Sequence, residues 1–390
     1  MKIGVPRETL DQERRVAVVP TVVSHLIKKG HVVVMEAGAG AQAGYPDEEY
    51  RKRKAELVSS RNEVFELAEV ILQVNGLGGN PEAGKADLQL MRQGQTVIGM
   101  LDPLWKPVAM QDLAQTGVTS FALELLPRIT RAQSMDTLSS MATVAGYKGV
   151  LIGADALHKM FPMLMTAAGS LAPAKVLVVG AGVAGLQAIS TAKRLGAVVS
   201  GYDIRPAVKE QIESLGAKFV EMDLGAQDAE TKGGYAKEQD DAVLQKQQEL
   251  MARVVAESDM VVTTAAIPGR KSPVIVTAEM VAGMAPGSVI VDLAAERGGN
   301  CALTQPGKTV DAGGVKILGP LNLASTIPFH ASQMYAKNIS TFLDHLIHEG
   351  EMKLDMEDEI TADTLITREG KVVNERVRAA LGEGAASSSN

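Results

Sequence analysis

The chain has 390 residues, of which 46% are apolar and 22% are charged, proportions typical of a soluble globular protein. This length exceeds a single hydrophobic core and favours two domains. The net charge of −7 argues against an electropositive surface for nucleic acid. No apolar run approaches the ~20 residues that cross a bilayer, and the strand-like start does not resemble a signal peptide. We therefore expect a cytoplasmic protein.

The single cysteine, Cys301, excludes an intrachain disulfide and any metal site with several cysteine ligands. No nucleophile motif surrounds it, so a small apolar side chain is favoured over a catalytic thiol. His345 and His348 are spaced like neighbours on a helix, but no further ligand accompanies them. A solvated helix face is therefore favoured over a metal site, and we expect no metal.

The first third of the chain alternates short apolar segments with segments of helical pattern. The expected strands are 3–5, 32–36, 70–74, 97–101 and 119–123. The expected helices are 21–29, 47–57, 62–68, 83–92 and 108–116. Such alternation predicts a mainly parallel sheet with helices on both faces.

Further elements are expected in the rest of the chain. A long helix is predicted to end near residue 160, and small or apolar residues recur along it: Leu138, Met141, Ala142, Ala145, Gly149, Ile152 and Ala156. A face so rich in small residues predicts close packing against another helix or across a domain boundary. Later strands are expected at 259–263, 288–292 and 315–318. An amphipathic helix over 331–348 and a hairpin near 364–373 follow.

A glycine-rich turn near the middle of the chain carries the strongest local signal. A strand-like run enters it, a helical segment leaves it, and Gly180, Gly182 and Gly185 have the spacing G-x-G-x-x-G. The first glycine of such a motif allows a tight turn, the second lets the backbone approach a pyrophosphate, and the third lets the helix pack closely. The helix start, with Val183 and Ala184, would offer free N–H groups to the phosphates.

A second strand-like run ends in Asp203, about 20 residues after the glycines, where an acid accepts hydrogen bonds from a ribose. A carboxylate there repels a 2′-phosphate and favours NAD(H) over NADP(H). Arg205 is the residue that blurs this choice, and Ile204 between the two is included in the predicted site. A glycine-rich turn without a ligand is the alternative.

A long connection between Met222 and Asp240 interrupts the alternation of strands and helices. Loops of that length are usually functional or disordered. Gly233 and Gly234 would provide hinge freedom beside Tyr235, an aromatic side chain suited to covering a bound ligand. A flexible surface insertion without a function is the alternative.

Several further segments accompany the glycine turn: PRITRAQSMD at 127–136, GGYAK at 233–237, TTAAIPG at 263–269, IVDLAAE at 290–296 and GGNC at 298–301. Together they closely resemble the NAD(H)-binding component (domain I, the soluble part of the α-subunit) of proton-translocating NAD(P)+ transhydrogenase. The resemblance extends from Lys2 to about Val373. The Arg-Ala-Gln-Ser-x-Asp loop is its most specific part.

The resemblance implies an α/β fold of two Rossmann-like domains with parallel sheets flanked by helices. Long helices would join the domains, with a cleft between them. The first domain would be discontinuous, residues 1–135 and 330–390, and the second, 136–329, would bind NAD(H). Residues 382–390 are expected to form a flexible tail.

The resemblance also implies roles for individual residues. The glycines would hold the pyrophosphate, and Asp203 the adenosine ribose. The residues implied at the nicotinamide end are Arg128, Gln133, Asp136, Ser139, Ala265, Ala266 and Pro268, and Tyr235 is implied as the lid residue. Gln133 would lie between the two nucleotides and act in catalysis together with Arg128 and Asp136. For Arg128 and Asp136 a mutual ion pair that holds the loop is the alternative. Asp292 is either functional or caps a strand end.

Alanine dehydrogenase is a related family with the same two-domain form and a similar start around Arg15. An amino-acid dehydrogenase must polarise a carbonyl group and move protons, so it needs a lysine and a histidine in its cleft. In our alignment Asn75 and Asp102 stand at these positions, and neither supplies a cation or an imidazole. Arg15, the equivalent of the carboxylate-binding residue, is retained, although such an arginine can simply pair with a neighbouring acid. These departures favour the transhydrogenase.

Hydride transfer between two nicotinamides needs no general acid or base, only rings held face to face with water excluded. The expected function is therefore transfer between NADH bound here and NADP+ on a partner component. Membrane-spanning proton-channel subunits would couple it to proton translocation, and they would attach this chain peripherally to the inner (cytoplasmic) membrane. The resemblance implies a homodimer. An alanine dehydrogenase-like enzyme and an NAD(H) sensor without catalysis are the alternatives.

Overall fold

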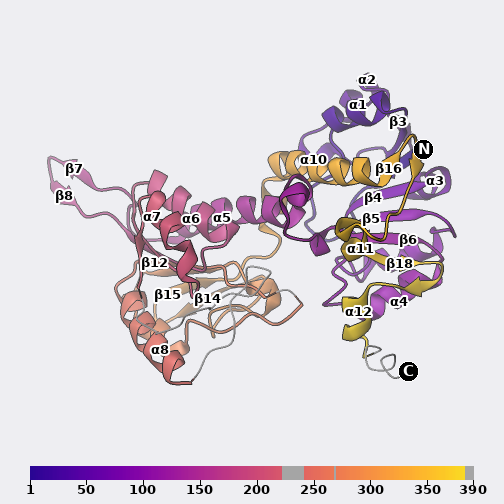
Figure 1. The fold of residues 1–390 in the computed structure, drawn as a ribbon. Helices are drawn as coiled ribbons and strands as arrows, with labels where there is room; N and C mark the ends of the chain where they lie inside the picture. Colours follow the sequence, from indigo (N-terminus) through magenta and orange to yellow (C-terminus); the bar gives the residue numbers. More distant parts are fainter. Residues whose placement is uncertain (222–240, 268, 383–390) are drawn as a thin grey trace, which may run out of the picture. The chain divides into compact units, whose positions relative to one another are not determined.

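The computed structural model describes residues 1–221, 241–267 and 269–382, with the side chains of 241–247 left aside. The chain divides into two compact units, which we describe separately (Figure 1): unit 1, residues 1–141 and 324–390, and unit 2, residues 142–323. The predicted covering loop with Gly233, Gly234 and Tyr235 lies outside the described residues, as do Pro268 and residues 383–390 of the predicted tail. In the described stretches of the chain, no helix has both the length and the apolar character needed to cross a membrane.

Unit 1 contains an eight-stranded sheet of order β19-β18-β6-β5-β4-β1-β2-β3. Its strands are β1 Lys2–Val5, β2 Val32–Glu36, β3 Glu56–Val58, β4 Val70–Asn75, β5 Thr96–Met100, β6 Thr119–Ala122, β18 Leu365–Arg368 and β19 Lys371–Val372. Strands β1 to β6 are parallel, and the hairpin β18–β19 adds two antiparallel strands at one edge. The strand order reverses between β1 and β4, so the carboxyl ends of these neighbours form a topological switch point.

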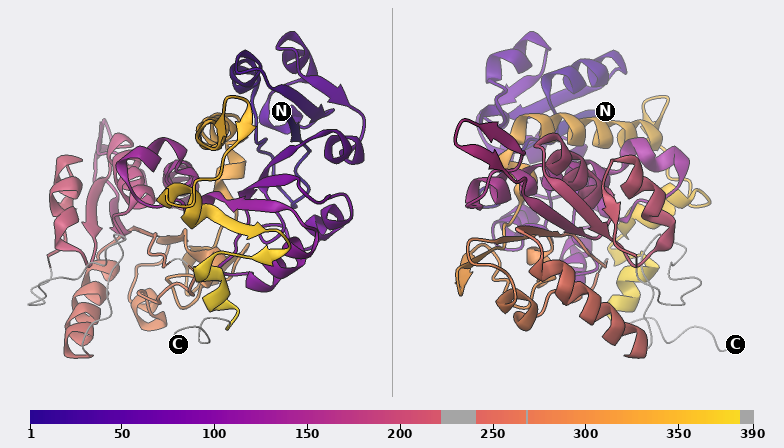
Figure 2. Two further views of the ribbon diagram at one scale, coloured as in Figure 1. Left: turned by 45° about the vertical axis from the view of Figure 1, so that its right-hand side comes forward. Right: turned by 90° about the vertical axis from the view of Figure 1, so that its left-hand side faces the viewer.

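Helices cover both faces of this sheet, as the alternation predicted (Figure 2). They are α1 Pro20–Lys28, α2 Asp47–Lys52, α3 Arg61–Leu67, α4 Pro107–Gln115, α10 Pro328–Leu346, α11 Glu359–Thr364 and α12 Glu375–Ala380. Helices α3, α4 and α12 share one hydrophobic core with the strands. On the other face α10 buries Tyr335, Ile339 and Phe342 completely, and the Phe342 ring meets that of Phe121 edge-on at 5.6 Å. The predicted amphipathic helix and the following hairpin are thus confirmed.

Two expected helices of unit 1 differ in the structure. The helix expected over 47–57 ends at Lys52, because Lys54 has a left-handed backbone conformation with φ +67°. The chain then forms β3, which pairs in parallel with β2 at the edge of the sheet. The expected helix over 83–92 is a 3₁₀ helix, Ala83–Gln89.

Unit 2 contains a seven-stranded sheet of order β11-β10-β9-β12-β13-β15-β14. Its strands are β9 Lys175–Val179, β10 Val198–Tyr202, β11 Lys218–Phe219, β12 Met260–Thr263, β13 Val289–Asp292, β14 Thr309–Ala312 and β15 Val315–Leu318. Only β14, which the sequence did not predict, is antiparallel to its neighbour. The order reverses between β9 and β12, so this sheet also has a switch point.

Long helices pack closely on the sheet of unit 2. They are α5 Thr137–Ala156, which begins in unit 1, α6 Val183–Arg194 and α8 Asp241–Ala256, with the shorter α7 Lys209–Ser214 and α9 Ala278–Ala282. A Cβ atom on Gly146 of α5 would lie 2.1 Å from the carbonyl oxygen of Ala184 in α6. One on Gly149 would lie 2.8 Å from Leu293. The close packing expected of this helix is confirmed, although the helix ends at Ala156 and not near residue 160.

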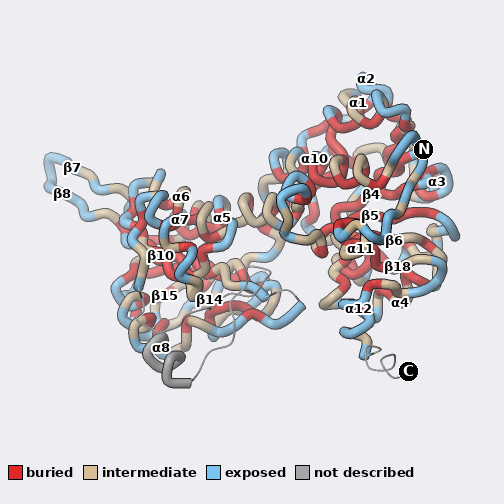
Figure 3. Tube along the Cα trace, viewed as in Figure 1, coloured by how far each residue is buried: buried red, intermediate tan, exposed pale blue. Residues whose placement is uncertain are grey.

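A hairpin of β7 (Leu164–Thr166) and β8 (Gly169–Leu171) projects from the body of unit 2 (Figure 1). Its residues are almost all exposed, whereas the central strands β9, β12 and β13 of the sheet are almost entirely buried (Figure 3). Met165 is 81% exposed and Met163 is 62% exposed. The hairpin therefore contributes little to the hydrophobic core of this unit.

Candidate functional site

The glycine turn of unit 2 connects β9 to α6 and requires glycine at two of its three positions. Gly180 has φ +94°, and a Cβ atom there would lie 2.7 Å from the hydroxyl oxygen of Thr264. A Cβ atom on Gly185 would lie 1.8 Å from the carbonyl oxygen of Gly180, so only glycine lets α6 pack this closely on the strand. A Cβ atom on Gly182 would meet nothing within 4 Å. The turn is thus tight underneath and open on the side where a ligand would approach.

The turn leads directly into the N-terminus of α6. Gly182 is the residue before the helix, Val183 and Ala184 are its first two residues, and Val183 is exposed. The first N–H groups of a helix have no partner within the helix, and the aligned peptide dipoles give this end a partial positive charge. This end of α6 therefore suits an anion such as a phosphate group.

Asp203 lies beside the glycine turn because β10 pairs in parallel with β9, which sets Tyr202 opposite Val179. Its carboxylate accepts a hydrogen bond of 2.7 Å from the N–H of Ala181, inside the turn. It also accepts bonds of 2.9 and 3.0 Å from Nε and Nη2 of Arg205. The acid and the arginine predicted near the ribose are thus one ion pair, largely buried, with Ile204 half-buried between them.

The segment after β12 completes this edge of the sheet. The Thr264 hydroxyl donates to the carbonyl oxygen of Gly180 at 3.0 Å, and the Thr264 N–H donates to Val179 at 2.8 Å. These bonds hold Ala265, which is half-buried, against the glycine turn, while the following Ala266 is exposed. The structure therefore brings together the predicted residues at 180–185, 203–205 and 265–266 at the switch point of unit 2.

The loop 128–139 belongs to unit 1 and forms a 3₁₀ helix, Thr130–Met135, before α5. Its buried side chains are Ala132, Met135 and Thr137, whereas Arg128 and Gln133 are exposed. Asp136 accepts hydrogen bonds from the N–H and the hydroxyl of Ser139, at 2.8 and 2.5 Å, at the start of α5. The loop is also held from α10, because Asn338 donates to the Ser134 carbonyl at 2.9 Å. Asp136 and Ser139 thus shape the loop, whereas Arg128 and Gln133 lie on its surface.

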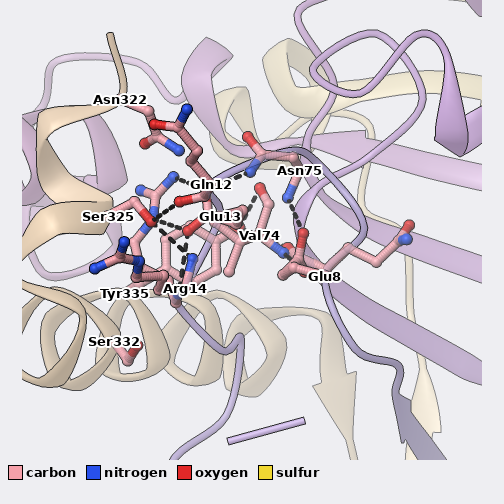
Figure 4. A network of polar contacts seen from close by, with 12 residues as sticks. Glu8, Gln12, Glu13, Arg14, Val74, Asn75, Asn322, Ser325, Ser332 and Tyr335 are labelled. Carbon is pink, nitrogen blue, oxygen red and sulfur yellow. Dashed lines mark hydrogen bonds and ion pairs between the residues drawn. The ribbon is translucent and has the colours of Figure 1, made fainter. Parts of the chain in front are cut away.

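A buried polar network occupies the switch point of unit 1 (Figure 4). Nε and Nη2 of Arg15 donate to the two carboxylate oxygens of Glu13 at 2.8 and 2.6 Å. Asn75, the last residue of β4, donates to the same carboxylate at 2.8 Å. The side chains of Arg15 and Glu13 are 3% and 0% exposed. The arginine that would bind a substrate carboxylate therefore pairs with an acid of its own chain.

A second carboxyl group, that of Glu8, lies in the same network. It accepts the N–H groups of Val74 and Asn75 at 2.7 and 3.1 Å. Burial raises the pKa of Glu8 to about 7, and the negative charge of Glu13 acts in the same direction. The buried Tyr335 hydroxyl of α10 donates to the Gln73 carbonyl at 2.8 Å, which fixes the end of β4 from the helix side.

Asp102 follows β5 with a left-handed φ of +51°, so its N–H turns toward the carboxylate of Glu124. Burial raises the pKa of Glu124 to about 7, and the negative charge of Asp102 adds to this effect. Asn75 and Asp102 thus lie at the carboxyl ends of the neighbouring strands β4 and β5. The two side chains present there are an amide and a carboxylate.

Asp292, at the end of β13, is completely buried and acts as a structural anchor. Its carboxylate accepts hydrogen bonds from the hydroxyls of Thr263 and Thr304 and from the N–H groups of Ala294, Asn300 and Cys301. The structure therefore favours the capping role over a catalytic one. Cys301 is 1% exposed, and burial raises the pKa of its thiol.

Within the described ranges, no three histidine, cysteine, aspartate or glutamate side chains gather as a metal site would require. The expected helical pairing of His345 and His348 is wrong, because α10 ends at Leu346 and His348 lies in the short strand Ile347–His348. His345 is half-buried and 3.2 Å from the Thr361 hydroxyl, so it does not lie on a solvated face.

The two halves of the chain match two family descriptions. Residues 4–145 match "Alanine dehydrogenase/PNT, N-terminal domain", and residues 149–375 match "Alanine dehydrogenase/PNT, C-terminal domain". The chain belongs to the alanine dehydrogenase/PNT family. Membership implies an oxidoreductase that binds a nicotinamide nucleotide.

Individual relatives lie on the transhydrogenase side of this family. The first part of the NAD(P) transhydrogenase subunit alpha of Rhodospirillum rubrum is 44% identical, over 99% of this chain and 100% of the relative. The protein of the same name from Rickettsia prowazekii is 43% identical, over 97% of each. These relatives confirm the resemblance to the transhydrogenase.

Solved structures agree with this assignment. The crystal structure of transhydrogenase from Sinorhizobium meliloti has a TM-score of 0.83 at 42% identity, covering 96% of this chain and 99% of that one. An L-alanine dehydrogenase structure has a TM-score of 0.82 at 27% identity, covering 99% and 100%. The predicted α/β fold with Rossmann-type sheets is confirmed, as is the relation to alanine dehydrogenase.

Proposed function

We propose that this chain binds NAD(H) at the switch point of unit 2 and exchanges hydride with NADP(H) held by a separate partner component. The open side of the glycine turn and the N-terminus of α6 suit the pyrophosphate. Asp203 lies beside the turn, where a ribose hydroxyl would donate to it, and its negative charge disfavours a 2′-phosphate. The ion pair with Arg205 offsets part of this repulsion.

The observation that carries the proposal is the composition of the other switch point. A dehydrogenase acting on an amino acid needs a cation for the carbonyl oxygen and a group that moves protons. Asn75 and Asp102 stand at the two strand ends in question, and Arg15 is engaged by Glu13. Transfer between two nicotinamides requires neither group, only close approach of the rings without water.

Further roles follow from the resemblance to the transhydrogenase. Arg128, Gln133 and Asp136 would act at the nicotinamide, with Gln133 between the two nucleotides and Ser139 beside the ribose. The exposed position of Gln133 suits contact with a second protein. Membrane-spanning subunits would couple the exchange to proton translocation and attach this chain to the membrane. The working form would be a homodimer.

A mixing experiment tests the proposal. NADH and thio-NADP+ are supplied to the chain alone, to the separately purified NADP(H)-binding component alone, and to both together. We expect hydride exchange only in the mixture. If the mixture of the two components shows no hydride exchange, the proposal is contradicted. Oxidation of NADH by the chain alone with pyruvate and ammonia would instead support an alanine dehydrogenase-like enzyme.

A further inference from the structure

Asn300 follows a pair of glycines after β13, and its side chain holds one peptide unit at the glycine turn. Its Oδ1 accepts the N–H of Ala265 at 2.9 Å, and its Nδ2 donates to the carbonyl oxygen of the same residue at 2.8 Å. Nδ2 also donates to the Pro273 carbonyl at 2.8 Å. Both amide hydrogens and the amide oxygen are therefore used, as a strand would use its backbone groups.

The position of Asn300 is itself fixed from several directions. The residue is 0% exposed, and its N–H donates to the carboxylate of Asp292 at 2.7 Å. Its carbonyl oxygen accepts the N–H groups of Ile275 and Val276 at 2.8 and 2.9 Å. Gly299 before it has φ +82°, and a Cβ atom there would lie 2.6 Å from the Asp292 carboxylate. The backbone of Asn300 is thus anchored before its side chain reaches Ala265.

Ala265 needs such a partner because it lies beyond the end of β12. Thr264 still bonds to Val179 and Gly180 of the neighbouring strand and turn, but the N–H and the carbonyl of Ala265 both go to Asn300. The next residues, Ala266 and Ile267, are exposed. Asn300 therefore determines where the chain leaves the sheet beside the glycine turn.

We propose that Asn300 is a positioning residue for the nicotinamide end of the dinucleotide. By holding both sides of the Ala265 peptide, it sets the exposed segment of Ala265, Ala266 and Ile267 at the distance from the glycine turn that the nicotinamide half of NAD(H) requires. This inference rests on the proposed function. It assigns a role in the site to a buried residue that the bound nucleotide does not touch.

Two ligands separate this role from a general structural one. AMP carries only the adenosine half, which the Asp203 side of the site would bind, whereas NADH also carries the nicotinamide half. In Asn300→Ala and Asn300→Ser, we expect the dissociation constant of AMP to change less than about twofold. That of NADH should rise about tenfold, and hydride exchange with the partner component should fall about 10- to 100-fold, because a displacement near 1 Å can cost about 100-fold. Calorimetric titration and the mixing assay measure these effects.

Asn374→Ala provides a matched control. Asn374 is a buried asparagine of unit 1 whose side chain also makes several backbone hydrogen bonds, at the start of α12. This variant should lose stability without changing the ratio of NADH affinity to AMP affinity. Equal weakening of both ligands in the Asn300 variants, or no weakening of either, would overturn the inference. A wild-type chain that binds neither ligand would contradict the proposed function instead.

Hydrogen exchange of the wild-type chain tests the same inference without any variant. Unliganded, the Ala265 N–H should exchange as slowly as the amides of β12, because Asn300 accepts it. NADH should slow exchange of the amides of Ala266 and Ile267, and AMP should not. An Ala265 amide that exchanges as fast as exposed loops, or equal protection by both ligands, would contradict the inference.

Discussion

The two sheets reverse their strand order at equivalent points, between β1 and β4 in unit 1 and between β9 and β12 in unit 2. The connection that follows the first strand differs. In unit 2 three residues, Gly180 to Gly182, lead from β9 to α6 and leave the switch point open on one side. In unit 1 the longer connection between β1 and α1 places Glu8, Glu13 and Arg15 at the switch point. The same topology thus holds an open glycine turn in one unit and an internal ion pair in the other.

The comparison shows that the topology only provides the crevice, and side chains decide what it holds. In unit 1 the carboxylate of Glu13 occupies Arg15. In unit 2 the small turn residues supply no such group, and Asp203 with Arg205 lies at one side. The following four predictions concern substitutions at one of the two switch points or at Gln133 in the loop 128–139.

The largest effect on stability is expected from Glu13→Ala. This change removes the carboxylate that accepts hydrogen bonds from Nε and Nη2 of the buried Arg15. Removing one partner of a buried ion pair costs about 3–5 kcal/mol of unfolding free energy. Urea unfolding should show this loss, and acetate should restore more stability to the variant than to wild type. The exposed Glu357→Ala is the control. A loss of unfolding free energy below about 1 kcal/mol would show that the pair between Glu13 and Arg15 contributes no more than an exposed ion pair does.

A pH dependence should follow from Glu8, whose pKa is about 7 in the folded chain and near 4.5 ordinarily. Between these values the folded chain holds a proton that the unfolded chain has lost, so this group's contribution to stability falls as pH rises from 4.5 to 7. Each pKa unit corresponds to about 1.4 kcal/mol, so wild type should lose about 2 kcal/mol more than Glu8→Gln between pH 5 and 7.5. Urea unfolding across this range measures the difference. Parallel pH curves for the two proteins would contradict the assignment.

Asp203→Asn should change the preference between the two nucleotides. The substitution keeps the size of the side chain but removes the charge that neutralises Arg205, which is then able to attract a 2′-phosphate. NADH affinity should fall about tenfold, equivalent to about 1.4 kcal/mol, while NADPH affinity rises. Asp311→Asn on the edge strand β14 controls for the substitution itself. Equal losses for both nucleotides would show that Asp203 does not discriminate between them.

The smallest effect is expected from Gln133→Asn, a change on the surface of unit 1 away from its buried network. If the side chain positions the rings, hydride exchange should slow about fivefold while NADH affinity changes less than about twofold. The mixing assay and NADH titration give the two values. Matching losses in exchange and affinity would instead assign Gln133 to binding.

Much of the fold could be predicted from sequence because the strands are short apolar runs separated by turn residues. The predicted strands of both sheets and the helix α10 are found within one to three residues at each end. The edge strand β3 was missed because it is three residues long and follows a helical pattern that only the left-handed Lys54 interrupts. The hairpin β7–β8 was missed because its exposed methionines show no alternation between a buried and an exposed face.

The candidate site also has features that the sequence predicts and features that it does not. The glycine turn and Asp203 are predictable because the motif is local and its geometry follows from the residue types. The contact between Asn300 and Ala265 joins residues far apart in the sequence and leaves no local pattern. The sequence suggests that Arg15 can pair with an acid, but it does not choose Glu13 among the neighbouring acids. The roles of Arg128, Gln133, Asp136 and Ser139 stay predictions.

The burial of Cys301 has a practical consequence. Its thiol is 1% exposed, its pKa is raised, and it is the chain's only cysteine. A cysteine reacts with alkylating reagents as the nucleophilic thiolate, so the buried, protonated Cys301 should stay unmodified while the protein is folded. Fluorophores or spin labels can then be attached to two cysteines introduced at chosen surface positions, one in each unit, with no native thiol to remove first. Distances between labelled positions would then follow the domains in solution during turnover.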